Sequence, residues 1–103
     1  MVLENLLITR CINDVEMKYI YKLTERQYKS VQAYGIEIER DDYKNGENVN
    51  IVKDSVDLIS PEKDKVKNLL DILYKNEVSP IHLIDIIGEY VDSYVSDFDK
   101  ILN

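Results

Sequence analysis

The residues best suited to chemistry in this 103-residue chain are one histidine and two carboxylates near its C-terminal end. His82, Asp85 and Glu89 stand at i, i+3 and i+7, and at about 100° per residue these positions share one face of a helix. An imidazole and two carboxylates on one face could bind a divalent cation. The same strip is also the polar face of an amphipathic helix, where acidic residues in the first turns offset the helix dipole. We therefore expect these three to be surface residues, and we expect neither a metal nor a cofactor.

The sequence gives less support to other catalytic arrangements. His82 is the only histidine, and no nucleophile elbow or glycine-rich turn presents Cys11 or a serine to it. The 3 glycines form no phosphate-binding loop, because none follows a strand and opens a helix with the required spacing. A lone cysteine in an apolar strand is most often a small buried hydrophobe. The sequence predicts a protein that is not an enzyme.

The charge balance restricts the partners. The chain has 13 basic and 20 acidic residues and a net charge of -7, which opposes binding to phosphate backbones and to anionic membranes. No apolar run approaches the ~20 residues that cross a bilayer. Glu4 stands where a signal peptide needs a basic start, and a single cysteine provides no disulfide framework. We expect a cytoplasmic protein with no nucleic acid and no membrane as its partner.

Two Ser-Pro pairs predict the starts of two helices, over about residues 61–76 and 80–102. Ser60 and Ser79 could each accept a hydrogen bond from a free N–H group at a helix start, and proline is favoured at the first helical position. Asn76 is an acceptable left-handed residue at the end of the first helix. Helical spacing of apolar residues follows each start: Val66, Leu69, Leu70 and Leu73, then Leu83, Ile86, Ile87, Tyr90, Tyr94, Phe98 and Ile101.

The first 59 residues predict strands. An apolar run over 2–12 is followed by Asn13-Asp14, a plausible two-residue hairpin turn, and residues 15–23 then alternate between apolar and polar. Residues 24–27 resemble a polar connection before a third alternating strand at 34–39. Asn45-Gly46 is the best turn signal, and the apolar phase of the fourth strand shifts near Asp54, which predicts a bulge or break there.

The predicted order is ββββαα, and strands followed by helices favour segregated layers. We therefore expect an α+β fold: a four-stranded antiparallel, meander-like sheet with two C-terminal helices packed on one face and a polar opposite face. The chain forms one domain, 1–103, with a sheet half at 1–59 and a two-helix half at 60–103.

Three fragments resemble an uncharacterised family of small acidic proteins from endospore-forming anaerobic bacteria. They are AYGIEIE (33–39), LISPEKDKV (58–66) and VSPIHLIDIIGEYVD (78–92). The resemblance implies a bacterial cytoplasm. It implies no activity and no functional residues.

A small acidic domain with 8 tyrosines and a long amphipathic helix is typical of a protein that binds another protein. The apolar arc of the last helix spans about 180°, which exceeds the ~100° needed to cover a core. We predict a contact with a separate protein partner, or a homodimer, through Val91, Tyr94, Val95, Phe98, Ile101 and Leu102. In the alternative, the first helix and the N-terminal strand cover the whole arc. Two rival functions are an acidic decoy that occupies a basic nucleic-acid-binding surface and a metal-dependent enzyme that uses the histidine and carboxylate strip.

Overall fold

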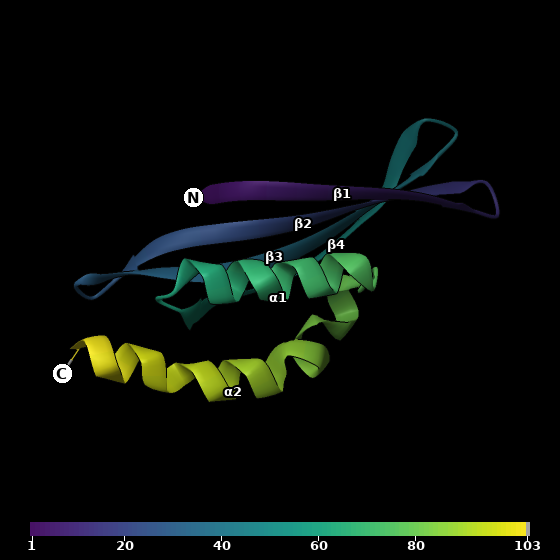
Figure 1. The fold of residues 1–103 in the computed structure, drawn as a ribbon. Coiled ribbons are helices and arrows are strands. Elements are labelled where there is room, and N and C mark those ends of the chain that lie inside the picture. The colour runs from purple at the N-terminus through teal and green to yellow at the C-terminus, as the bar shows by residue number, and fades with distance from the viewer. Residues whose placement is uncertain (103) are drawn as a thin grey trace.

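The computed structural model describes residues 1–102, apart from the side chains of residues 95, 101 and 102. Four strands are followed by two α-helices, which are joined through a short 3-10 helix (Figure 1). The elements are β1 (Val2–Ile12), β2 (Val15–Tyr28), β3 (Val31–Lys44), β4 (Glu47–Ser60), α1 (Lys63–Lys75), η1 (Pro80–His82) and α2 (Leu83–Leu102). The predicted α+β class and the ββββαα order are confirmed.

The sheet is an antiparallel meander in the order β1-β2-β3-β4, built from three two-residue turns. Asn13-Asp14 and Asn45-Gly46 form the predicted turns, and all four residues have positive φ, as reversals of this kind require. The prediction of a polar connection at 24–27 is wrong: β2 continues to Tyr28, and the turn falls at residues 29–30, where Lys29 has φ 55°. The strands are therefore longer than the alternation indicates, and two hairpin tips extend beyond the helices (Figure 1).

β4 is irregular at two places, and neither is Asp54. Its register against β3 shifts between Asn50 and Asn48, and again between Val56 and Ser60. The second shift lies opposite Gly35, where an added Cβ would be 2.3 Å from the Val56 carbonyl oxygen and 2.6 Å from that of Asp57. A glycine is required where a neighbouring backbone comes this close. The bulge that explains the phase change thus lies just beyond the predicted position.

The helix starts differ from the prediction. α1 begins at Lys63 after Glu62, and Ser60 is the last residue of β4, although its Oγ accepts a hydrogen bond from the Glu62 N–H at 3.0 Å. Ser79 precedes η1 but caps nothing, because its buried Oγ has no hydrogen-bond partner among the described residues. At the end of α1, Glu77 takes the left-handed conformation with φ 52°, and Asn76 does not.

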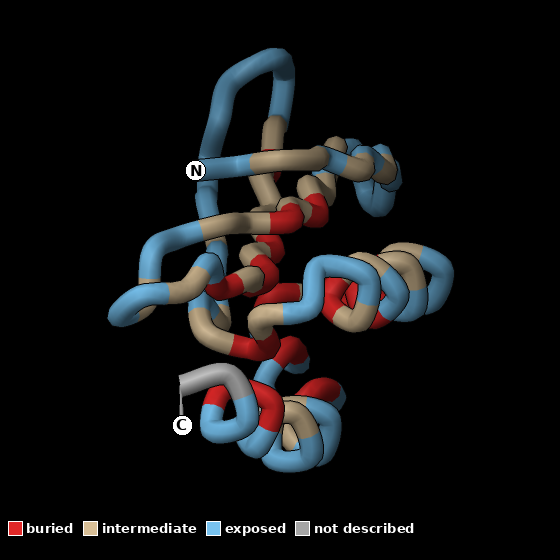
Figure 2. The backbone as a smooth tube through the Cα atoms, turned by 60° about the vertical axis from the view of Figure 1, so that its left-hand side comes forward, coloured by how far each residue is buried: buried red, intermediate tan, exposed pale blue. Residues whose placement is uncertain are grey.

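The core lies between one face of the sheet and the two helices, and the tube in Figure 2 is red there and pale blue at the hairpin tips. Fully burying one leucine or isoleucine contributes roughly 1.5–3 kcal/mol, so this cluster supplies much of the stability. Tyr21 lies within it and donates a hydrogen bond to the Val78 carbonyl at 2.9 Å, which ties the sheet to the connection between the helices. Burial raises the pKa of Tyr21 above its ordinary value. The fully buried members are Tyr21, Leu23, Ile36, Ile38, Ile59, Val66, Leu70, Leu73, Leu83 and Ile87.

The opposite face of the sheet carries charged side chains and a few exposed apolar ones. Lys22 lies between Glu37 and Glu39, with its Nζ 2.9 Å and 3.1 Å from their carboxylates. The hydrogen bond to Glu37 raises the pKa of Lys22 despite partial burial. Leu7 and Ile51 also lie exposed on this face, so it is not uniformly polar.

Candidate functional site

The three residues that the sequence singles out for chemistry lie in two successive elements. His82 lies in η1 while Asp85 and Glu89 lie in α2, and all three are exposed. Within the part of the chain that the structure describes, no group of three or more His, Cys, Asp or Glu side chains is placed to hold a metal ion. These residues are surface residues of the helical half, as expected from an amphipathic helix.

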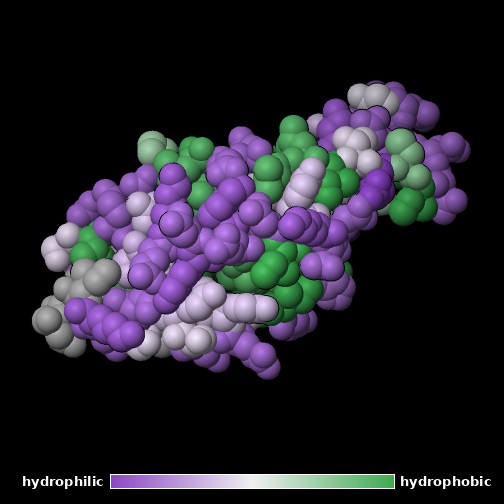
Figure 3. Space-filling view, in the orientation of Figure 1, coloured by the Kyte–Doolittle hydropathy of each residue, from purple (hydrophilic) through white to green (hydrophobic). Residues whose placement is uncertain are grey.

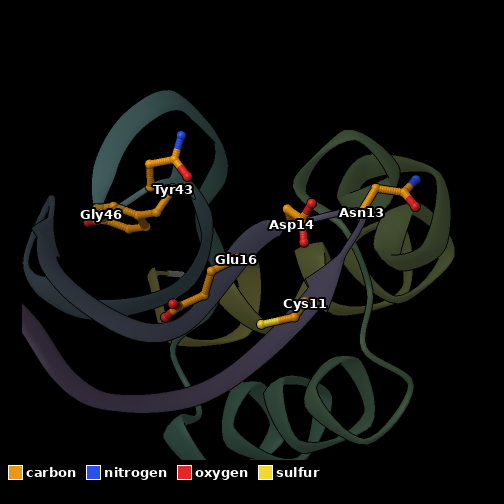
Figure 4. Close-up of a pocket in the computed structure, with 7 residues that line it drawn as sticks. Cys11, Asn13, Asp14, Glu16, Tyr43 and Gly46 are labelled. Atoms are coloured by element: carbon orange, nitrogen blue, oxygen red, sulfur yellow. The ribbon is translucent and has the colours of Figure 1, made fainter.

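A hollow of about 420 Å³ lies between the two hairpin tips, and Figure 4 shows side chains that line it. Cys11 and Glu16 are direct cross-strand partners there, and Tyr43 pairs with Glu16 on the next strand. Cys11 is exposed, which differs from the buried position expected of it. His82 is the only histidine of the chain, and it lies in the helical half rather than in this hollow, so the hollow has no imidazole to activate the thiol.

Two carboxylates on the open face of the sheet are electrostatically linked. The proximity of Asp41 lowers the pKa of Glu39, whereas burial raises the pKa of Asp41. Lys22 and Lys53 add positive charge beside the pair. The pair belongs to the ion network of this face, in which Lys22 also bonds to Glu39.

The flank of α2 predicted to contact a partner is partly turned inward. Phe98 is only 6% exposed and packs against Tyr28, with ring centroids 5.5 Å apart. Val91 and Tyr94 are half-buried and pack against the core. The side chains of Val95, Ile101 and Leu102 lie outside the described part of the structure. Phe98 is thus covered by its own chain, through Tyr28 of β2 rather than through the first helix and the N-terminal strand, and the predicted contact of the flank stays a prediction.

A buried carboxylate holds this part of α2 in place. Asp97 is only 8% exposed, and its Oδ2 accepts hydrogen bonds from Lys65 Nζ at 2.7 Å and Ser60 Oγ at 3.3 Å. The Lys65 hydrogen bond lowers the pKa of Asp97, and the same bond raises that of Lys65. Lys65 also bonds to Glu62 and lies 5.0 Å above the Tyr94 ring. The end of the sheet, the start of α1 and the second half of α2 meet at this carboxylate.

A groove remains open between the first half of α2 and β4. Its volume is about 240 Å³, and Val56 from the strand faces Ile84, Gly88 and Val91 from the helix across it. A Cβ added to Gly88 would meet nothing within 4 Å, so the missing side chain widens the groove. Ile84 is 52% exposed beside it. Sequence reasoning missed this groove, although a glycine within a helix interior was a signal for it.

Carboxylates border the groove along α2. Asp85, Glu89 and Asp92 are exposed and lie within about 60° of one another on the helix, next to Ile84 and Gly88, and exposed Asp99 continues this strip about two turns beyond the groove. Asp92 itself lines the groove. On the strand side, exposed Asp54 lies two residues before Val56 and exposed Asp57 directly follows it, with the Asp57 carboxylate 3.5 Å from the guanidinium of Arg26. The result is an apolar floor with an acidic rim.

The chain matches one protein family. The match covers residues 2–93, and the family is described as a family of unknown function, DUF6514. The chain belongs to this family. The match confirms the resemblance to an uncharacterised family and extends it over the N-terminal strands, which none of the three fragments includes. No curated protein and no solved structure matches the chain. No helix in the described range is long and apolar enough to cross a membrane.

Proposed function

We propose that this member of the family is a non-enzymatic protein-protein interaction domain that binds a basic protein segment in the groove between α2 and β4. The observation that carries the proposal is the apolar groove of Val56, Ile84, Gly88 and Val91 with exposed carboxylates on both of its sides. An apolar centre with a charged rim is the usual composition of a protein-binding surface. We place this interaction in a bacterial cytoplasm, which is supported by the resemblance of the three fragments.

The charges indicate the chemistry of the partner. A net charge of -7, together with the acidic residues of α2, gives a field that attracts basic segments and speeds their encounter with the groove. The apolar floor of the groove fits one or two apolar side chains of the partner, and its acidic rim fits lysine or arginine beside them. Binding should therefore weaken with added salt but persist in part, because burial of the apolar side chains is not screened.

A second candidate function shares the same helix. Successive carboxylates of the α2 strip are three, four or seven residues apart, so at 1.5 Å per residue they are separated by roughly 4.5–10 Å along the helix axis. Separations of this order resemble those between phosphates, which favours an acidic decoy that occupies a nucleic-acid-binding surface. A decoy would depend on the carboxylates and not on the apolar groove.

Affinity capture with matched variants separates these functions. The immobilised chain would be exposed to lysate of the organism that encodes it, as wild type, as Gly88→Leu and as Ser93→Leu. Gly88→Leu fills the groove, whereas Ser93→Leu adds the same side chain to an exposed position on the other side of α2. Circular dichroism would first establish that both variants are folded.

We expect a basic protein that wild type and Ser93→Leu retain and that Gly88→Leu loses at least tenfold. Titration calorimetry with the purified captured protein should reproduce this order of affinities. A captured protein that binds Gly88→Leu as well as wild type contradicts the groove. If its binding is lost when Asp85, Glu89 and Asp92 are all replaced by their amides, the decoy function holds instead.

A further inference from the structure

β1 is an open edge of the sheet. It pairs only with β2 among the described strands, and α1 packs mainly over β2, β3 and β4 and reaches β1 through the ion pair of Lys67 with Glu4. In an antiparallel hairpin with a two-residue turn, the pair that closes the turn is hydrogen-bonded, and bonded pairs then alternate along the strands. The closing pair is Ile12 with Val15, so the even-numbered residues from Leu6 to Ile12 bond to β2. The backbone groups of Asn5, Leu7 and Thr9 therefore point outward.

The two edges of the sheet differ in how they are protected. β4 is bulged twice, carries Lys53 and Asp54, and is packed against α2 and η1. These features discourage the pairing of a further strand. Between Glu4 and Ile12, β1 is regular and lacks both proline and lysine. Leu7 at its centre is 65% exposed, and Figure 3 shows apolar surface recurring along the edge that β1 forms.

We propose that two copies of this chain pair antiparallel through β1, with a two-fold axis at Leu7, to form a continuous eight-stranded sheet. In this register Leu7 opposes Leu7 of the second copy, and Asn5 opposes Thr9. Three residues on each strand would each contribute one donor and one acceptor, which makes about six hydrogen bonds between the copies.

Charge complementarity selects this register. Glu4 and Arg10 lie on the helix-bearing face of β1, where Glu4 bonds to Lys67 and Arg10 to Glu77. With the axis at Leu7, Glu4 of each copy directly opposes Arg10 of the other, and such cross-strand pairs stabilise a sheet. Opposed residues must lie on the same face, so the nearest alternative axes are at Leu6 and Ile8. An axis at Leu6 places Glu4 opposite Ile8, and an axis at Ile8 places Glu4 opposite Ile12. Neither alternative places Glu4 opposite Arg10.

The second copy also fits the apolar residues of the strand. On the helix-bearing face Leu6 would oppose Ile8, which extends the half-buried edge of each core into the other. On the open face the two Leu7 side chains would meet beside Ile20, which is the partner of Leu7 on β2. The groove on α2 stays free at the far side of each copy, so this inference is independent of the proposed function.

Mass measurement on charge variants tests the register. By light scattering at micromolar concentrations, wild type should have twice the 12.1 kDa mass of the chain. Glu4→Arg and Arg10→Glu should each be monomeric, because each opposes like charges across the axis. A 1:1 mixture of these two variants should form a heterodimer, because every opposed pair is then complementary again. Recovery in the mixture cannot come from refolding within one chain.

A second variant tests the axis itself. Leu7→Lys places two lysines against each other and should give a monomer with an unchanged circular dichroism spectrum. Ile51→Lys makes the same change at an exposed position on β4 and should leave the dimer intact. The proposal is overturned by a monomeric wild type, by a dimer that survives Leu7→Lys, or by single charge variants that stay monomeric when mixed while wild type dimerises.

Discussion

Replacing Gly35 by alanine tests how β4 is held against β3. The new Cβ would lie 2.3 Å from the Val56 carbonyl oxygen and 2.7 Å from the Asp57 carbonyl carbon. Ordinary contacts of this kind are about 3.5 Å, so backbone must move by roughly 1 Å on one strand or the other. Both contacts are with backbone, and no side-chain rotation can relieve them.

The cost of Gly35→Ala should reach the upper end of overpacking effects, about 3 kcal/mol. For a domain of this size that corresponds to a melting temperature lower by roughly 12 °C or more. Gly88→Ala is the matched control, because its Cβ meets nothing within 4 Å and alanine is the better helix former. It should raise the free energy of unfolding by about 0.5–1 kcal/mol.

Urea and thermal unfolding followed by circular dichroism measure both variants, with wild type alongside. An unchanged urea m-value would show that the difference lies in stability and not in the extent of unfolding. A Gly35→Ala variant within 1 kcal/mol of wild type would refute the close crossing of the two strands. The position of Val56 at the groove would then lose its structural basis.

Two further predictions concern the serines and the buried carboxylate. Ser60→Ala should cost about 1 kcal/mol, because Ser60 accepts a hydrogen bond from the Glu62 N–H and donates one to Asp97. Ser79→Ala should cost nothing measurable, since the Ser79 Oγ has no hydrogen-bond partner among the described residues. Equal urea midpoints for the two variants would contradict this difference. The Lys65 hydrogen bond lowers the pKa of Asp97 below its ordinary 3.8. The stabilisation of the fold by this carboxylate is therefore complete above pH 3.8 and is lost as the pH falls through the lower pKa of the folded state. Acid unfolding from about pH 5 down to about pH 2 should therefore be shallower in Asp97→Asn, and curves of equal slope would mean that the carboxylate is not paired.

The sequence predicted the parts of the fold that local chemistry determines. Asn13-Asp14 and Asn45-Gly46 were recognisable because their side chains tolerate positive φ, and both turns are confirmed. The turn at Lys29 carries no such signal. Residues 24–27 are polar and therefore predict a connection, yet they remain in a strand whose hydrogen bonds to β3 do not depend on an apolar face.

Long-range contacts explain what the sequence could not predict. The bulge in β4 is determined by Gly35 on the neighbouring strand, and its position cannot be derived from β4 alone. Ser60 resembled a helix cap, but its hydroxyl donates to Asp97, which lies 37 residues further along. Asp97 is one of several acidic residues in the sequence of α2. Its burial depends on Lys65 from another helix, and no pattern within α2 indicates that pairing.

The part of α2 that the sequence predicts to be open differs from the part that the structure leaves open. The sequence assigned a protein contact to α2, and the flank it named includes Phe98, which packs against Tyr28. The apolar residues that remain open lie nearer the start of the helix, at Ile84 and beside Gly88. The apolar arc of α2 is wide enough to include both parts, and the packing of the helix against Tyr28 and β4 decides which part is covered.

Hydrogen exchange of the chain with and without its captured basic partner is the most direct test of the proposed interface. Binding in the groove should slow exchange at residues 84–92 of α2 and at residues 54–57 of β4, because the partner would exclude water from both sides. The same comparison on Gly88→Leu should show no such protection at equal concentrations. Protection confined to the open face of the sheet or to the hairpin tips, with residues 84–92 unaffected, would contradict the account.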